Sequence, residues 1–349
     1  MTTTRLREFT AKLDRVRRWL EAEGRDAVEL TRYAWLAWLL GGAEARVLAA
    51  ADRGSCSVRI TRDRVVVVTN NIEAPRLREE EDLAALPVEW EVHDWWEPPL
   101  PSQVVDDLPP RLRFSLLPEE VERARRLAGD AREAIETVAR FLEPGRTEHQ
   151  IASRLAEQVT ARGIVPIGLF VAADERGKQY RHPLPTAKIA QRNVILSMVV
   201  RRGGLHASLT RMVSFGPACE SMHQRHRAVT QVHAAMLDAS RPGATLGAVF
   251  TAAQRAYAEQ GFSDEWRLHH QGGPTGYEPR EVRATPESPI PLEENQLVAW
   301  NPTIRGAKSE ETALVTSGGV ELLTAGETVA SVQWPVSSRA DRLSDILIL

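Results

Sequence analysis

A glycine-rich segment that directly follows two adjacent histidines constrains this chain more than any other feature. His269 and His270 run into Gln271–Tyr277, so an imidazole lies where the backbone can bend sharply and approach a ligand closely. The apolar run Leu297–Trp300 then ends in an Asn-Pro pair, and Lys308–Thr312 leads into a second apolar run. Two strand-like segments therefore present polar side chains beside an imidazole. A hairpin with one surface and one core histidine is the simpler alternative, but the clustering of these features favours a functional site.

Length and composition limit the number of domains, the possible partners and the cellular compartment that we expect for this chain. A chain of 349 residues is long for one core, which predicts two domains. A net charge of -3 provides no basic surface for nucleic acid, and no apolar run approaches the ~20 residues that span a bilayer. The N-terminal residues predict an amphipathic helix in place of a signal peptide, and Cys56 and Cys219 form no Cys-x-x-Cys pair. We therefore expect a cytoplasmic protein with reduced cysteines.

Strand-like and helix-like patterns alternate over the first 115 residues. Apolar residues at helical spacing predict a helix over 6–23 that stops at Gly24, and Val65–Asn70 is the clearest strand. This alternation predicts a small α/β domain. The Trp95-Trp96 pair lies in a proline-rich tract over 95–101. The pair could anchor an interface, but we expect its rings to fold back on the domain core. The other predicted elements are strands at 27–30, 46–50, 57–60 and 88–93, a Trp-bearing segment at 33–40 and a charged helix at 73–85.

The second half of the chain has clear helix boundaries. Pro118 precedes a helix over 119–142, and Thr147 with Gln150 matches a capping box at the start of the next helix, which runs to Arg162. His223 and His226 could hold a metal at their i, i+3 spacing, but the flanking arginines favour a solvated helix face, and His233 lies on the same helix. Further strands are predicted at 165–171, 194–200 and 205–213, and further helices at 222–240 and 246–260.

The order of five motifs resembles the pita-bread family (M24), which contains methionine aminopeptidase, proline aminopeptidase, prolidase and creatinase. The motifs are the His182-Pro183 loop, the Gly-x-His-x-Ser-x-Thr-Arg turn over 204–211, the His-x-Gly-Gly segment at His270, the Asn301-Pro302 strand end and the Lys-Ser-Glu-Glu-Thr strand over 308–312. The resemblance implies an α+β chain with a creatinase-type α/β N-terminal domain (1–115), a pita-bread domain (118–335) and a C-terminal tail (336–349). It also implies a homodimer.

The family's metallopeptidases hold two divalent ions with Asp, Asp, His, Glu and Glu. By resemblance these positions fall on Ser197, Ser208, His270, Asn301 and Glu310, so only one carboxylate remains. Hard divalent ions prefer several charged oxygen ligands. We therefore expect no cofactor, with a divalent metal held weakly by His270 and Glu310 as the alternative.

Creatinase implies how the fold can catalyse without metal, because it is a metal-free hydrolase that uses an imidazole as acid and base. The leading hypothesis is a creatinase-like hydrolase or lyase acting on a small C–N-containing substrate or short peptide. His270 transfers the proton, Glu310 orients it, and His182 binds the substrate or its developing charge. The residues expected to bind the substrate are Tyr277, Arg280, His206, Ser208 and Asn301.

Two other functions remain open. A former peptidase can keep its pocket as a binding or scaffold site, in which His270 and Glu310 satisfy each other as a buried polar pair. Alternatively, the chain is a metal-dependent Xaa-Pro aminopeptidase or dipeptidase with an atypical site.

Overall fold

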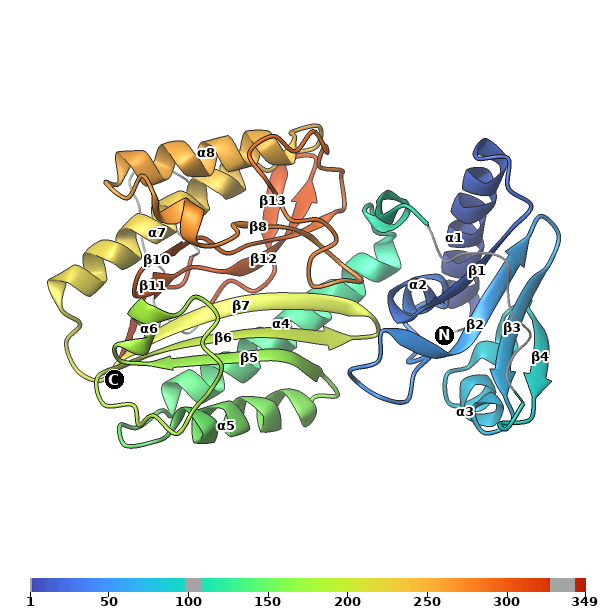
Figure 1. Cartoon of the computed structure of the whole chain (residues 1–349), viewed down its shortest axis with the longest axis horizontal. Helices are drawn as coiled ribbons and strands as arrows, with labels where there is room; N and C mark the ends of the chain where they lie inside the picture. Colours follow the sequence, from blue (N-terminus) through green and yellow to red (C-terminus); the bar gives the residue numbers. More distant parts are fainter. Residues whose placement is uncertain (1, 98–107, 327–342) are drawn as a thin grey trace. The chain divides into compact units, whose positions relative to one another are not determined.

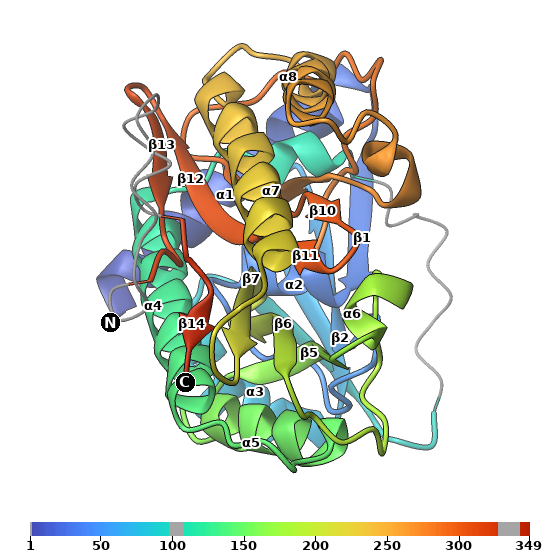
Figure 2. The ribbon, with the colours of Figure 1, turned by 90° about the vertical axis from the view of Figure 1, so that its left-hand side faces the viewer.

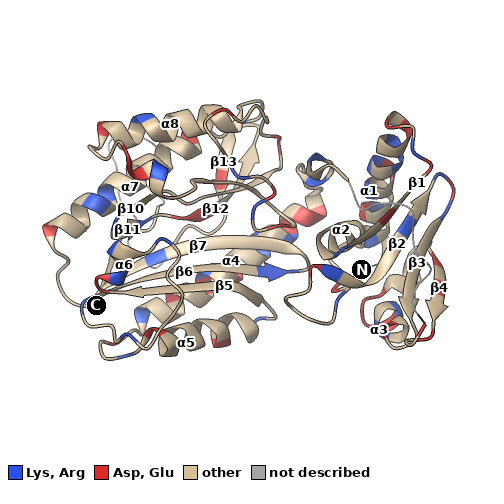
Figure 3. Cartoon of the chain, viewed as in Figure 1, with Lys and Arg blue, Asp and Glu red and all other residues tan. Residues whose placement is uncertain are grey.

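The computed structural model describes residues 2–97, 108–326 and 343–349, which fall into two units (Figure 1). The first consists of residues 1–113 with 117–120 and 203–205, and the second of residues 114–116, 121–202 and 206–349. Among the described residues, none of the helices combines the length and apolar character that crossing a membrane requires. Basic and acidic residues are interspersed along the ribbon of each unit (Figure 3).

The N-terminal unit is built on a four-stranded sheet in the order β1-β2-β3-β4. The first three strands pair antiparallel, and β3 pairs parallel with β4. The strand predicted at Val65–Asn70 is confirmed as β3, and the helix predicted over 6–23 is confirmed as α1 (Thr2–Ala22). The remaining elements are β1 (Ala27–Arg32), α2 (Tyr33–Leu39), β2 (Arg53–Thr61), α3 (Glu73–Glu79), η1 (Leu83–Ala85), β4 (Glu89–His93) and η2 (Pro110–Arg113).

Three predictions in this unit are wrong. The segment 46–50 forms a bend and a turn in place of a strand. The helix predicted over 73–85 breaks because Asp82 adopts a left-handed conformation with φ 54°, which separates α3 from η1. Trp95 and Trp96 do not fold back on the core: they are 62% and 61% exposed and contact each other edge to face. The rest of their tract, from Pro98 to Pro101, lies outside the described residues.

The second unit contains two four-stranded sheets, one in the order β14-β7-β6-β5 and the other in the order β13-β12-β9-β8. Helices α4 and α5 cover the outer side of the first sheet, and α7 and α8 cover that of the second (Figure 1). The elements are α4 (Pro118–Arg140, within this unit from Val121), α5 (Glu148–Thr160), β5 (Val165–Ala173), α6 (Arg176–Gln179), β6 (Asn193–Arg202), β7 (Leu205–Ser214), α7 (Glu220–Ala239), α8 (Leu246–Glu259), η3 (Glu265–Leu268), β8 (Gly272–Thr275), β9 (Leu297–Trp300), β10 (Thr303–Ile304), β11 (Ala307–Lys308), β12 (Glu311–Thr316), β13 (Gly319–Leu322) and β14 (Leu347–Ile348).

Local sequence signals explain several of these boundaries. The predicted capping box is confirmed, because the Thr147 side chain accepts from the Gln150 backbone N–H and the Gln150 side chain accepts from that of Thr147. The solvated face predicted for His223 and His226 is wrong for His226, which is buried; His233, further along the same helix, is buried as well. His226 Nδ1 lies 3.4 Å from an Asp345 carboxylate oxygen, which faces it from the chain's last residues.

The glycine-rich segment forms strand β8, where a sharp turn was predicted. Gly272 pairs with Trp300 of β9, and its φ of 102° is one that side-chain-bearing residues rarely adopt. A Cβ atom on Gly272 would lie 2.1 Å from the Ala299 carbonyl oxygen. The glycines are therefore required for the close approach of β8 to β9, which fixes the backbone beside His270.

The C-terminal residues belong to the second unit. Strand β14 pairs parallel with β7 through Leu347 and Val213, as Figure 2 shows. Of the tail expected at 336–349, residues 336–342 lie outside the described residues, as do residues 327–335 of the domain expected to end at 335.

The two sheets of the second unit meet along β7, whose ten residues are all buried. The backbone N–H of Thr210 donates to the Glu310 carbonyl at 3.0 Å, and that of Ser208 donates to the Thr312 hydroxyl at 2.8 Å. Polar side chains therefore line the contact between the sheets, next to the apolar core under α7 and α8.

Candidate active site

The carboxylate of Glu310 is the centre of a buried polar cluster between the two sheets. Glu310 is 3% exposed and directly precedes β12. Its Oε2 atom lies 2.7 Å from Lys308 Nζ and accepts from the hydroxyls of Ser197 and Thr210, each at 3.0 Å. Its Oε1 atom accepts from Arg280 Nη2 at 3.1 Å. Each carboxylate oxygen therefore has its own positively charged partner.

Each of these two cations also contacts one of the two serines to which the resemblance assigns the family's metal-binding aspartates. Lys308 Nζ donates to Ser197 Oγ of β6 at 2.8 Å, and Arg280 Nη1 donates to Ser208 Oγ of β7 at 3.3 Å. Ser197, Ser208 and Glu310 thus come together as the resemblance implies, but Lys308 and Arg280 link them. Lys308 had no assigned role; the available signal was its place two residues before Glu310, which puts both side chains on one face of an extended chain.

The charges of the cluster keep Glu310 ionised despite its burial. Burial raises its pKa, but Lys308, Arg280 and the hydroxyl of Thr210 together lower the pKa of Glu310 to about 2. Burial lowers the pKa of the Arg280 guanidinium, and Glu310 opposes that shift. The cluster therefore contains two positive charges and one negative charge at neutral pH.

Three imidazoles lie next to this cluster. His182, His269 and His270 bring one ring nitrogen each within 4.8 Å of one another, and His182 Nε2 lies 3.1 Å from His269 Nε2. Burial, followed by Lys308, lowers the pKa of His269 to about 2. Burial, followed by Arg280, lowers that of His270 to about 4, and burial also lowers the pKa of His182. All three rings are therefore neutral at pH 7. The functional prediction from the sequence gave His269 no role.

The donor set does not fit the family's two metal ions. By resemblance two serines and an asparagine stand at three of the family's carboxylate positions, and Glu310 already binds Lys308 and Arg280. The three imidazoles match the ligand number of a catalytic zinc site. However, Lys308, Arg280 and Arg283 all lower the pKa of one or more of these rings through their positive charge, and the same field repels a metal cation.

The expected pair of His270 with Glu310 is not a direct contact. No hydrogen bond joins them among the described residues, and His270 Nδ1 is buried without a partner there. The Asn301 side-chain oxygen is likewise buried and unpartnered in the described part of the chain, while the Asn301 backbone N–H donates to the Gln271 carbonyl at 3.1 Å. The backbone hydrogen bond between Asn301 and Gln271 thus brings His270, which directly precedes Gln271 along the chain, close to Asn301. His270 Nδ1 and Asn301 Oδ1 are both without a partner within the described residues.

The other expected substrate-binding residues have protein partners. The backbone N–H of His206 donates to the Gly276 carbonyl at 2.8 Å, and its ring Nδ1 lies 3.1 Å from the same oxygen. Tyr277 is buried, and its hydroxyl lies 3.4 Å from Arg123 Nη2. These contacts connect the segment after β8 to β7 and α4, so both residues support the shape of the site.

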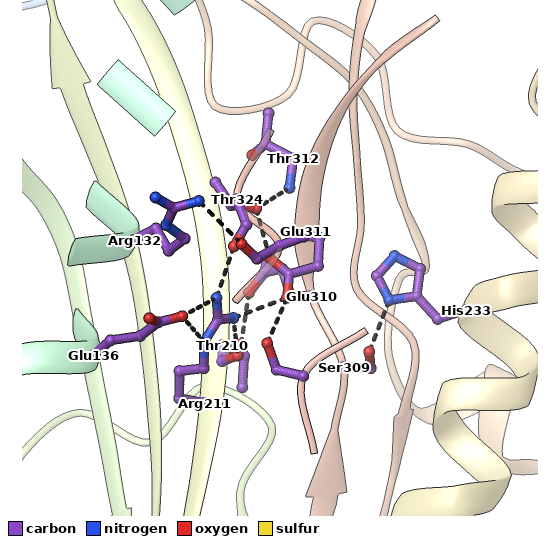
Figure 4. A network of polar contacts seen from close by, with 12 residues as sticks. Arg132, Glu136, Thr210, Arg211, His233, Ser309, Glu310, Glu311, Thr312 and Thr324 are labelled. Carbon is purple, nitrogen blue, oxygen red and sulfur yellow. Dashed lines mark hydrogen bonds and ion pairs between the residues drawn. The ribbon is translucent and has the colours of Figure 1, made fainter. Parts of the chain in front are cut away.

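A second buried network holds the chain on both sides of Glu310 (Figure 4). Arg211 of β7 donates to Glu136 at 3.1 Å and to Glu311 at 2.8 Å. On the other side, His233 Nδ1 lies 2.7 Å from Ser309 Oγ. Burial raises the pKa of Glu311 to about 7, while Arg211 opposes that shift. These contacts fix the backbone on both sides of Glu310.

A small cavity of about 20 Å³ adjoins the cluster. Its lining residues include the apolar Phe170, Ile195 and Ile304 and the polar Lys308, Ser197, Arg181, Tyr180 and Thr303. This volume holds about one water molecule or methyl group. The cluster is therefore bordered by a space in which a small ligand group can reach Lys308.

The chain belongs to the metallopeptidase family M24, because residues 119–317, more than half of its length, match the family profile. It is 27% identical over 224 residues to the probable dipeptidase PepE of Mycobacterium tuberculosis, a match that covers 59% of this chain and 58% of that protein. It is 22% identical over 232 residues to the Xaa-Pro dipeptidase of Pyrococcus furiosus, covering 64% of this chain and 66% of the relative. The chain thus matches less than two thirds of the length of these curated relatives.

Solved structures show the same fold. The prolidase from Pyrococcus horikoshii OT3 superposes with a TM-score of 0.77 at 18% identity, over 91% of this chain and 99% of that one. The dipeptidase PepE from Mycobacterium ulcerans gives 0.75 at 19% identity, over 99% of both chains. The N-terminal domain of FACT complex subunit SPT16 from Cicer arietinum gives 0.67 at 13% identity, over 93% and 96%. The α+β pita-bread fold expected from the motif order is confirmed.

Proposed function

We propose that this protein is a metal-independent hydrolase or lyase of the M24 family that acts on a small C–N-containing substrate, with His270 as acid and base. The observation that carries the proposal is the Glu310 carboxylate, which binds two side-chain cations beside an imidazole whose Nδ1 has no partner within the described residues. Family membership and relatives with peptidase names support hydrolysis. A homodimer in the cytoplasm remains part of this proposal.

The proposed reaction starts from the neutral form of His270. Its ring accepts a proton from water, the resulting hydroxide attacks the substrate's electrophilic carbon, and the protonated ring then donates to the leaving nitrogen as the C–N bond breaks. Arg280 stabilises negative charge that develops on the substrate oxygen or nitrogen. Glu310 keeps both cations in place, where the sequence had suggested that it orients His270. His182 and the Asn301 oxygen bind polar groups of the substrate.

A binding or scaffold function is the second candidate. A base with a pKa of about 4 accepts protons weakly at neutral pH, which favours a site that binds a ligand without converting it. The same fold also occurs in a domain of a FACT complex subunit, a protein that is not named as an enzyme. This similarity supports a function without catalysis.

Substitution of His270 separates these functions. Wild-type protein, His270→Gln and the control His149→Gln, at an exposed position on α5, are treated with chelator and assayed against Xaa-Pro dipeptides, guanidino acids and cyclic amidines. We expect wild type and His149→Gln to turn over one of these classes, and kcat/KM to fall about 100-fold or more in His270→Gln. Turnover that requires about two added metal ions per chain would support a metallopeptidase. Stabilisation by a compound without turnover would support the binding function.

A further inference from the structure

We propose that Lys308 and Arg280 replace the family's two metal ions at Glu310, and that Lys308 binds the carboxylate group of a small acidic substrate. The proposed function assigns the proton transfer to His270. This inference rests on the proposed function in one respect, namely that the bound ligand is a substrate. It adds the chemical class of that ligand and the residue that recognises it.

The arrangement of contacts is the first support. Each cation connects Glu310 to one of the two serines that stand at aspartate positions: Lys308 contacts Ser197, and Arg280 contacts Ser208. A serine side chain is shorter than an aspartate and carries no charge, so space and negative charge are both lost at these positions. The long side chains of Lys308 and Arg280 fill that space with positive charge.

The charge balance is the second support. Lys308 and Arg280 are opposed by Glu310 alone within the cluster, and the three neighbouring imidazoles are neutral. Arg283 adds a further positive charge that acts on His182 and His270. A buried site with surplus positive charge favours an anion over a cation.

Unused hydrogen-bond donors are the third support. The Lys308 ammonium has three N–H groups, and two of them are used within the described residues, by Ser197 and Glu310. The buried Nε–H group of Arg280 has no partner in the described ranges. Lys308 also lines the small cavity, which has room for about one ligand atom beside this residue. A carboxylate provides acceptor oxygens and the missing negative charge together.

A matched pair of probes tests this without knowledge of the substrate. Propionate and propionamide have nearly the same shape and differ in charge, and their binding to chelator-treated wild-type protein is measured by calorimetry at constant ionic strength. We expect propionate to bind at least 10-fold more tightly than propionamide. Equal affinities, or no binding of either probe, would overturn the proposal. This comparison needs no variant, so it holds even if a substitution at Lys308 prevents folding.

Two lysine variants then locate the binding group. Lys308→Met removes the charge and keeps most of the side chain, and Lys188→Met makes the same change at a partly exposed lysine paired with Glu175. We expect Lys308→Met to lose at least 10-fold in propionate affinity, with propionamide binding unchanged, and Lys188→Met to behave as wild type. Equal propionate affinity in all three proteins would overturn the proposal. Selective propionate binding without turnover of any compound would contradict the hydrolase and leave this inference intact. Turnover of a compound without selective propionate binding would support the hydrolase and contradict this inference.

Discussion

His233 shows how far burial changes the chemistry of a single residue in this chain. It is fully buried on α7, where burial lowers its pKa from 6.5 to about 3. Between pH 6.5 and 3 the unfolded chain therefore binds a proton at this residue that the folded chain does not, so stability falls as the pH falls. We expect this residue to contribute about 2 kcal/mol to the loss of unfolding free energy between pH 7 and pH 5.

Urea unfolding of wild type, His233→Asn and His149→Asn at pH 7 and pH 5 checks this. His149 is exposed, so its variant should show the wild-type difference between the two pH values, whereas the difference should shrink in His233→Asn. It should not vanish, because burial also lowers the pKa of His226 and His270 to about 4. An unchanged difference in His233→Asn would show that His233 does not titrate in this way.

Residue burial is also where prediction from the sequence was weakest. His226 and His233 lie on a helix whose arginines indicated a solvated face, yet both are buried, because α7 contacts the second sheet and the C-terminal residues on different sides. Lys308 had no assigned role, because its partners Ser197 and Glu310 meet only after β6 and the segment before β12 are brought together. Local sequence patterns do not predict contacts between residues that lie more than a hundred positions apart in the chain.

At the scale of elements, the close contact of β8 with β9 depends on glycine. Gly272→Ala would place a Cβ atom 2.1 Å from the Ala299 carbonyl oxygen at a φ of 102°. We expect this variant to lose about 3 kcal/mol or more of stability, since strain and displacement of the backbone add. Gly318→Ala is the matched control: a Cβ atom there meets nothing within 4 Å, so its effect should stay within about 0.5 kcal/mol. Thermal unfolding of both variants measures this, and similar midpoints would refute the steric argument.

The C-terminal residues offer a second matched pair. Ile346 is 5% exposed and belongs to the core under α7 and α8, whereas Ile348 of β14 is 45% exposed. Ile346→Ala should cost about 2–4 kcal/mol of unfolding free energy, and Ile348→Ala less than about 1 kcal/mol. Urea titrations of the two variants provide the comparison. Equal losses would mean that β14 does not pack on the unit as the structure has it.

Elements were more predictable than single contacts wherever their signals are local. The capping box at Thr147 and the apolar run of β3 depend on neighbouring residues, and both were confirmed. The segment 46–50 has a strand-like composition but no partner strand, and Asp82 ends a helix whose charged pattern continues past it. An element that needs a distant partner, or ends at an unusual backbone angle, cannot be assigned from its own residues.

At the scale of the whole molecule, this fold contains a carboxylate paired with two side-chain cations, between the two sheets of its second unit. The chain superposes on a prolidase with a TM-score of 0.77 at 18% identity, and the order of its motifs was enough to predict this fold. By resemblance the same motifs lack three of the family's carboxylates, but the contacts of Lys308 and Arg280 with Glu310 became visible only in the structure. Apolar contacts under the outer helices and the glycine contact of β8 preserve the architecture, so the central polar residues are free to change.

Rebuilding the family's ligands tests whether the centre alone determines the chemistry. The variant with Ser197→Asp, Ser208→Asp and Asn301→Glu restores three carboxylates around His270 and Glu310, and a second variant adds Lys308→Ser. Two unit charges of the same sign that lie 4 Å apart repel each other by about 4 kcal/mol at an effective dielectric constant of 20. The repulsion between the Lys308 ammonium and a divalent ion at that distance is twice as large. We therefore expect the variant without Lys308 to bind Mn²⁺ at least 10-fold more tightly than the triple variant. Calorimetric titration with Mn²⁺, supported by elemental analysis, measures both affinities. Equal affinities would show that Lys308 does not oppose a metal ion, and tight binding by wild type would contradict the replacement of metals by side chains.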